Sequence, residues 1–114
     1  MTIRVGTVEI KDPVILAPMS GVTDMPFRRL VKRYGSGLVV SEMIASVAMI
    51  NATRRSMKMA TNCAEEHPMS VQLAGCEAHV MAEAARLNEV SRISRLVIYP
   101  QCKGSRQHSG YCQW

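Results

Sequence analysis

The sequence lacks several features that define common classes of protein. No apolar run approaches the roughly 20 residues of a membrane-spanning helix, and the N-terminus has no apolar segment of the kind found in secretory signal peptides. The four cysteines form no C-x-x-C pair and the histidines have no paired spacing, so the sequence predicts no metal site. These absences predict a cytoplasmic protein with free thiols, partly buried at Cys63 and Cys76, and no membrane partner.

Acidic residues are absent from the C-terminal end of the chain. All nine Asp and Glu residues lie in residues 1–89 beside ten Lys and Arg, a formal charge of +1, whereas residues 90–114 have four basic residues and none acidic, a charge of +4. The overall charge of +5 therefore belongs mainly to the tail, residues 90–114. It is a weak argument for nucleic acid binding by the rest of the chain.

The residues that are present indicate a globular α/β protein. Apolar residues make up 47% of the chain, and the mean hydropathy is +0.01. Periodicity and turn residues predict a short hairpin over residues 3–10, strands over 14–17, 38–40, 68–73 and 96–99, and helices over 25–34, 44–51 and 77–88. Alternation of this kind argues for a parallel sheet, either doubly wound or a (β/α)₈ barrel.

The helices are expected to bury apolar stripes and to expose their charged residues. In the first helix the stripe is Phe27, Leu30, Val31 and Tyr34, and in the last it is Val80, Ala84 and Leu87. The basic residues of the first helix are expected on its solvated outer face rather than on an RNA-binding patch; they are Arg28, Arg29, Lys32 and Arg33.

The chain is organised around the segment 14–28, which reads as a strand, a tight loop and a helix start. Its loop, together with Ser41-Glu42-Met43 and Val71-Gln72-Leu73-Ala74-Gly75, follows the end of an apolar run. Loops at the carboxyl ends of parallel strands are where α/β proteins bind ligands. These three motifs, in this order, resemble the N-terminal signature of the tRNA-dihydrouridine synthases, over about residues 1–89.

The resemblance implies the fold, the cofactors and the substrate. It favours the barrel and predicts the N-terminal three to four β/α units of an incomplete (β/α)₈ TIM barrel. It implies an FMN enzyme that uses NADPH to reduce the C5–C6 double bond of uridine in tRNA. Matched position by position, Pro18, Met19, Ser20 and Gln72 are the residues expected to hold FMN.

The resemblance fails beyond residue 89. The family supplies its catalytic acid as a cysteine in an N-x-G-C-P motif, but Cys102 stands between Gln101 and Lys103, so no catalytic residue is assigned. Residues 1–89 are therefore expected to be the N-terminal part of a flavin-binding barrel. The tail is expected to be an aberrant or frame-shifted C-terminus.

Three other hypotheses remain open at this point. The chain as it stands can be a truncated, non-catalytic product, a small basic RNA-binding module, or another flavin barrel related to the dihydroorotate dehydrogenases. The RNA-binding module has no RNP-type or zinc-knuckle motif to support it. The Ala-Pro-Met and Thr-Asp-x-Pro-Phe-Arg segments favour the tRNA-dihydrouridine synthases over the other flavin barrels.

Overall fold

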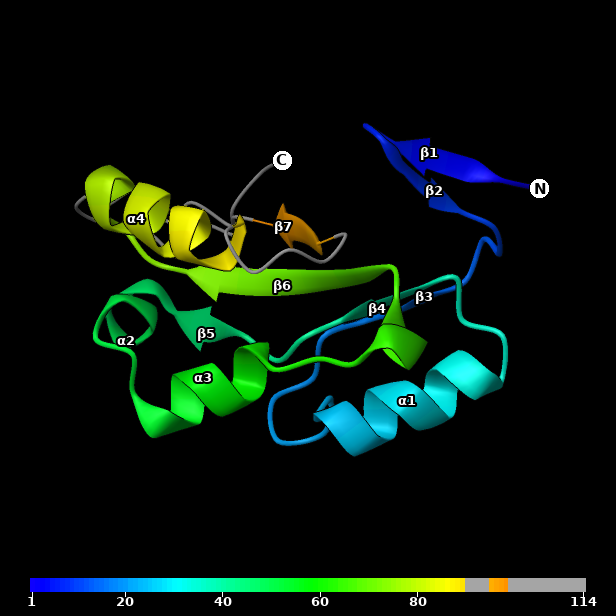
Figure 1. Ribbon diagram of the computed structural model, residues 1–114, viewed down its shortest axis with the longest axis horizontal. Helices are drawn as coiled ribbons and strands as arrows, with labels where there is room; N and C mark the ends of the chain where they lie inside the picture. Colours follow the sequence, from blue (N-terminus) through cyan, green and yellow to red (C-terminus); the bar gives the residue numbers. More distant parts are fainter. Residues whose placement is uncertain (90–94, 99–114) are drawn as a thin grey trace, which may run out of the picture.

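The computed structural model describes residues 1–89 and 95–98, which form a parallel sheet, four α-helices and a separate hairpin (Figure 1). The strands are β1 (Ile3–Val5), β2 (Val8–Ile10), β3 (Ile15–Leu16), β4 (Leu38–Val40), β5 (Ile44–Ala45), β6 (Met69–Ala74) and β7 (Arg95–Ile98). The helices are α1 (Met25–Arg33), α2 (Ser46–Ile50), α3 (Arg54–Ala60) and α4 (Ala78–Glu89), with a short 3₁₀ helix, η1 (Ala64–Glu66).

The main sheet is parallel, and its strands are paired in chain order. β3 pairs with β4, β4 and β5 pair with successive parts of β6, and β7 pairs with β6. Because β7 pairs with the same residues of β6 as β4 does, it occupies the opposite edge of β6, as Figure 1 shows. A doubly wound sheet reverses its strand order at a switch point, whereas a barrel does not. The order therefore favours the barrel.

A break separates β4 from β5, and the buried Ser41 repairs the ladder there. Its backbone N–H donates to the carbonyl of Ser70 (2.8 Å), and its hydroxyl accepts from the N–H of Gln72 (3.1 Å). The side chain thus replaces a backbone partner that the break removes. The three residues 41–43 leave the regular strand, which allows Glu42 to reach out of the sheet.

The core lies between β6 and the helices at its carboxyl end. Met69, Val71 and Leu73 of β6 are fully buried, and α4 contributes its own buried residues, Met81, Ala84, Ala85 and Asn88. The predicted stripe of α4 is right only at Ala84, since Leu87 is 42% exposed. A Cβ atom at Gly75 would collide with Ser46 and Met81, which explains a glycine where β6 turns into α4.

Helix α1 has the predicted limits but not the predicted buried face. Asp24 caps it by accepting from the N–H of Phe27 (3.0 Å), and Gly35, with φ +97°, follows its end. Leu30 and Tyr34 are 49% and 85% exposed, and the only buried residue of the helix is Arg28. The predicted apolar stripe is therefore wrong at Leu30 and Tyr34, whereas Phe27 and Val31 are partly buried, because α1 turns an arginine toward η1 and β4, against which it packs.

Strand β3 is shorter and more exposed than the sequence predicts. The apolar run over residues 14–17 forms a strand at Ile15–Leu16 alone, and Val14 and Ile15 are 59% and 50% exposed. The strand pairs only with β4 among the described residues, so it is an edge strand. The prediction of a buried first strand is wrong for that reason.

The remaining elements lie close to their predicted positions. The predicted hairpin is present as β1 and β2, and the predicted fourth strand is present as β7. The predicted helix over residues 44–51 begins two residues late, at Ser46 after β5, and Ala52 (φ +48°) separates α2 from α3. In the described part of the chain, no helix has the length and apolar character needed to cross a bilayer.

Candidate functional site

The loops that follow the parallel strands gather at one edge of the sheet. Leu16 pairs with Val39, which pairs with Met69, so the three strands run in step toward their carboxyl ends. Just beyond that row come Pro18–Ser20 after β3, Glu42 after β4 and Gln72 within β6. This edge is where ligands bind in parallel α/β proteins.

The β3–α1 loop, residues 17–24, is fixed from within by Thr23. Its fully buried hydroxyl donates to the carbonyl of Met19 (2.9 Å) and accepts from the N–H of the same residue (3.1 Å). The Met19 carbonyl also accepts from the backbone N–H groups of Val22 and Thr23. The loop is therefore a closed turn whose outer side, with Pro18 and Ser20, faces solvent.

Glu42, which follows β4, connects this strand to the β3–α1 loop by hydrogen bonds. Its Oε1 accepts from the hydroxyl of Ser20 and from the N–H of Gly21, both at 3.0 Å, and lies 3.9 Å from Nη2 of Arg55. The Glu42 side chain is only 13% exposed. Hydrogen bonds to a carboxylate are stronger than those between neutral groups, so these contacts hold the β3–α1 loop in position against the residue after β4.

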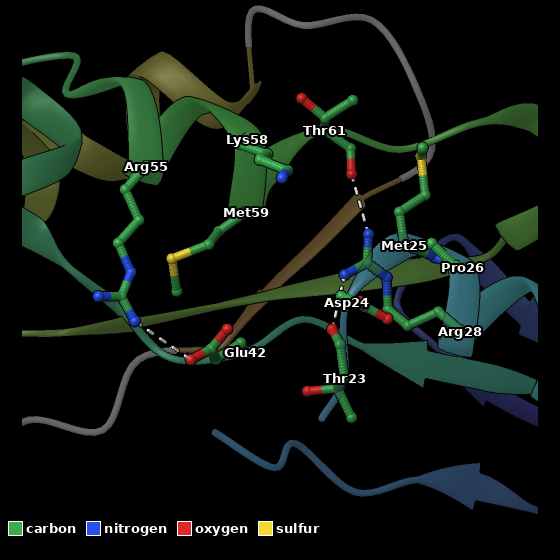
Figure 2. Close-up of a pocket in the computed structure, with 10 residues that line it drawn as sticks. All are labelled: Thr23, Asp24, Met25, Pro26, Arg28, Glu42, Arg55, Lys58, Met59 and Thr61. Carbon is green, nitrogen blue, oxygen red and sulfur yellow. Dashed lines mark hydrogen bonds and ion pairs between the residues drawn. The ribbon is translucent and has the colours of Figure 1, made fainter. Parts of the chain in front are cut away.

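A groove runs between the β3–α1 loop and helix α3 (Figure 2). It consists of a larger pocket of about 420 Å³ and a smaller one of about 230 Å³. The larger is lined by Thr23, Asp24, Met25, Pro26, Arg28, Glu42, Arg55, Lys58, Met59 and Thr61. The two pockets share Glu42, Arg55 and Met59, and the smaller one reaches Ser20.

Arg28 joins the two walls of the groove. Its Nη1 donates to the carbonyl of Thr23 (2.8 Å), its Nη2 to that of Thr61 (2.9 Å), and its Nε to Glu66 (2.6 Å), as Figure 2 shows in part. Arg28 and Glu66 are 1% and 0% exposed. The prediction that Arg28 lies on the solvated face is therefore wrong. A charge run of four basic residues gives no sign of which one turns inward, and Glu66 lies 38 residues away.

The other three basic residues of α1 are at least partly exposed to solvent. Arg29 and Arg33 pair with Glu65 at 3.0 and 3.2 Å on the outer face, as predicted. The hydrogen bond from Arg29 holds the pKa of the Glu65 carboxyl below its ordinary value. Lys32 is half-buried and donates to the carbonyl of Gly37, and its burial lowers the pKa of its ammonium group.

The four residues expected to hold FMN are placed at the same edge but not on adjacent strands. Pro18, Met19 and Ser20 are exposed, and Gln72 is partly buried. Strand β4 lies between the strand that leads to Pro18 and the one that carries Gln72, so the expectation of neighbouring strands is wrong. Ser20 lines the smaller pocket, and the other three line neither of the two pockets.

The cysteines differ from the expectation in one case. Cys63 is partly buried, as predicted, and Cys76 is exposed, because the turn after β6 leaves it at the surface. Cys102 and the tail, except β7, lie outside the described residues. Within the described residues, no three His, Cys, Asp or Glu side chains gather in a way that could hold a metal ion.

The comparisons with a family model and with curated proteins both identify dihydrouridine synthases as the relatives of this chain. The family model described as dihydrouridine synthase (Dus) matches residues 15–97. A probable tRNA-dihydrouridine synthase of Rickettsia conorii is 48% identical over 110 residues, which cover 96% of this chain and 33% of the relative. The corresponding protein of Rickettsia prowazekii is 51% identical over 113 residues, with 96% and 34% covered.

A further match extends the comparison to another genus. The tRNA-dihydrouridine synthase B of Xanthomonas axonopodis pv. citri is 51% identical over 85 residues, covering 75% of this chain and 26% of the relative. No solved structure gave a significant match. The chain therefore spans about a third of the length of the curated relatives it matches most fully.

Proposed function

This chain belongs to the dihydrouridine synthase family, and we propose that its residues form the flavin-ring side of an FMN-dependent tRNA-dihydrouridine synthase. The family fold is a (β/α)₈ barrel, and the described residues supply four parallel positions of that barrel, in chain order. The set is incomplete. The alternative is that the chain is a fragment without activity of its own.

The observation that carries the proposal is the fixed β3–α1 loop. Thr23 closes it from inside and Glu42 holds it from β4, so Pro18–Ser20 present an exposed surface that does not need to reorganise to receive a ligand. A pre-organised surface of small and apolar groups suits a flat ring. The pyrrolidine of Pro18 and the thioether of Met19, which is 40% exposed, provide that surface.

Gln72 provides the polar part of the proposed flavin contact. Its backbone N–H is already satisfied by Ser41, and its side-chain amide offers both donors and an acceptor. The pyrimidine-like edge of a flavin needs such mixed hydrogen bonding. Barrel enzymes usually bind a phosphate with the loops after strands seven and eight, so the described residues fit the ring of FMN and not its phosphate.

The bound FMN, recharged by NADPH, would supply the hydride that reduces the C5–C6 bond of uridine in tRNA. An acid must protonate the other carbon, and no described residue is assigned that role. In this proposal, the chain's own residues bind and orient the ring. The tRNA substrate and a cytoplasmic location are part of the same proposal.

A chimera tests the proposed function. Residues 15–97 would replace the matching segment of the Rickettsia conorii relative, which then supplies the rest of the barrel and its own catalytic loop. We expect the purified chimera, given NADPH and an unmodified tRNA transcript, to add two hydrogens to a uridine, detected by mass spectrometry. A folded chimera that leaves the transcript unchanged, while the parent relative reduces it, would contradict the proposal.

A further inference from the structure

The groove leads away from the proposed flavin surface. Its smaller pocket contains Ser20, at the proposed ring site, whereas the larger pocket includes none of the four proposed flavin residues. The larger pocket lies between the start of α1 and helix α3. It is a second compartment beside the first, and the two share the lining residues Glu42, Arg55 and Met59.

The two walls of the larger pocket differ in charge. Arg55 and Lys58 stand three residues apart on α3, on one face of that helix, and the Arg55 side chain is 83% exposed. The opposite wall carries the carboxylates of Asp24 and Glu42. Arg28 is a poor further ligand for an anion, because it is 1% exposed and already donates to Glu66 and to the carbonyls of Thr23 and Thr61. An anion entering the groove is therefore drawn to α3.

Between these walls lie apolar, polarisable side chains. Met25 and Pro26 come from the start of α1, and Met59 comes from α3 (Figure 2). Thioethers adapt to flat aromatic surfaces. A nucleotide has a phosphate at one end and a flat base with N–H donors at the other, which matches a cationic wall, an apolar floor and a carboxylate wall.

We propose that this groove binds a single-stranded segment of the RNA substrate, with a backbone phosphate on Arg55 and Lys58 and a neighbouring base against Met25 and Met59. The choice of RNA over another nucleotide rests on the proposed function. The larger pocket shares three lining residues with the smaller one at the ring site, which suits a strand that continues past a nucleotide held at the flavin. Stacking and phosphate contacts are the usual means of binding single strands.

Methionine methyl groups give a direct test in the 114-residue chain. The probe is a uridine octamer, titrated into protein with ¹³C-labelled methionine methyls. We expect the Met25 and Met59 signals to move. Met57 is the matched control, because it lies on the same helix, is 48% exposed and lines neither pocket. Its signal should stay in place.

Substitutions on α3 provide a second measurement. Arg54 is the matched control for Arg55, since it is an exposed arginine of the same helix outside both pockets. We expect Arg55→Ala and Lys58→Ala each to weaken octamer binding several-fold and to reduce the slope of log affinity against log salt by about 0.7. Arg54→Ala should change the affinity less than twofold, and the methyl spectrum of each variant checks that it is folded.

The outcomes separate this proposal from the proposed function. Equal losses for Arg54→Ala and Arg55→Ala, equal shifts of Met57 and Met59, or no octamer binding at all would overturn the groove proposal. Displacement of the octamer by NADPH, with the same methyl shifts, would assign the groove to a free dinucleotide and overturn it too. Failure of the chimera to reduce tRNA, with Met25 and Met59 shifting as expected, would count against the proposed function alone.

Discussion

Two arginine–glutamate contacts on helix α1 are adjacent in sequence and opposite in environment. Arg28 and Glu66 lie 2.6 Å apart, and both side chains are almost fully buried. Their sequence neighbours Arg29 and Glu65 lie 3.0 Å apart, and those side chains are 38% and 49% exposed. The residue types are the same. The difference is that Arg28 also holds the carbonyls of Thr23 and Thr61, on two walls of the groove.

The comparison shows that the worth of an ion pair depends on what surrounds it. Removing one partner of a buried pair leaves a charge without compensation in the interior, which costs several kcal/mol. An exposed pair gains little, because water screens both charges and the side chains lose freedom. The buried pair therefore has a structural role in shaping the groove, and the exposed one is a surface feature.

Arg28→Ala should have the largest effect of the changes considered. It leaves the Glu66 carboxylate buried and removes the link between Thr23 and Thr61, so we expect a loss of about 3–5 kcal/mol in the free energy of unfolding. Urea denaturation followed by circular dichroism measures it. Arg29→Ala is the matched control on the neighbouring residue. A loss below about 1 kcal/mol for Arg28→Ala would show that the pair is not buried in solution.

Glu42 stands between the two pairs in exposure, and its removal should have an intermediate effect. Glu42→Ala deletes the acceptor for Ser20 and Gly21, and we expect a loss of about 1–2 kcal/mol together with faster hydrogen exchange at the Gly21 amide. Glu42→Gln keeps an acceptor oxygen and should preserve most of the protection. If Gly21 exchanges equally fast in the wild type and in Glu42→Ala, the loop is not held by Glu42.

Glu65 should have the smallest effect, and that effect depends on pH. Its folded-state pKa is lowered by Arg29, so the pair stabilises the fold above the ordinary pKa of 4.5, and the stabilisation is lost as the pH falls through the lowered value. We expect the melting temperatures of the wild type and Glu65→Gln to differ slightly at neutral pH and to converge in acid. Added salt should reduce the difference at neutral pH. A difference that grows on acidification would contradict this assignment.

The sequence predicted the elements of this fold better than their faces. Apolar runs and turn residues located the hairpin, α1 and the strands, because those signals are local. The buried faces depend on neighbours that are distant in the chain. Arg28 is buried because Glu66 folds against it, and Val14 and Ile15 are exposed because β3 has one partner strand among the described residues. The local pattern of apolar residues in the sequence contains no information about either of these long-range contacts.

For the candidate site, the sequence indicated the strand-end residues but not the side chains that support them. The strand-end motifs identified Pro18–Ser20 and Gln72, and their flavin role stays a prediction. From the sequence, Thr23 stands beside the helix cap Asp24 with no sign of a further role, yet its hydroxyl closes the loop on Met19. Glu42 had no assigned role, and the break at residues 41–43 that lets it reach Ser20 has no signal in the sequence beyond the end of an apolar run.

The tail prediction stays a prediction. The expectation that the resemblance ends at residue 89 is wrong, since the family model extends to residue 97 and the two Rickettsia relatives align with 96% of the chain. Strand β7 also pairs with β6 in parallel register, which continues the barrel pattern past residue 89. The rest of the tail lies outside the described residues. Reading the coding DNA downstream of codon 89 in three frames checks the prediction, and the absence of an N-x-G-C-P-like motif from both alternative frames would count against a frameshift.

The flavin content of three purified proteins tests the central claim most directly. We expect the chimera that carries residues 15–97 to be yellow with about one FMN per chain and its Gln72→Leu variant to lose most of the FMN. The isolated 114 residues should hold little or none, since they span about a third of the relatives' length and a barrel usually binds phosphate with the loops after strands seven and eight. A folded, colourless chimera would contradict the account. So would stoichiometric FMN on the isolated chain.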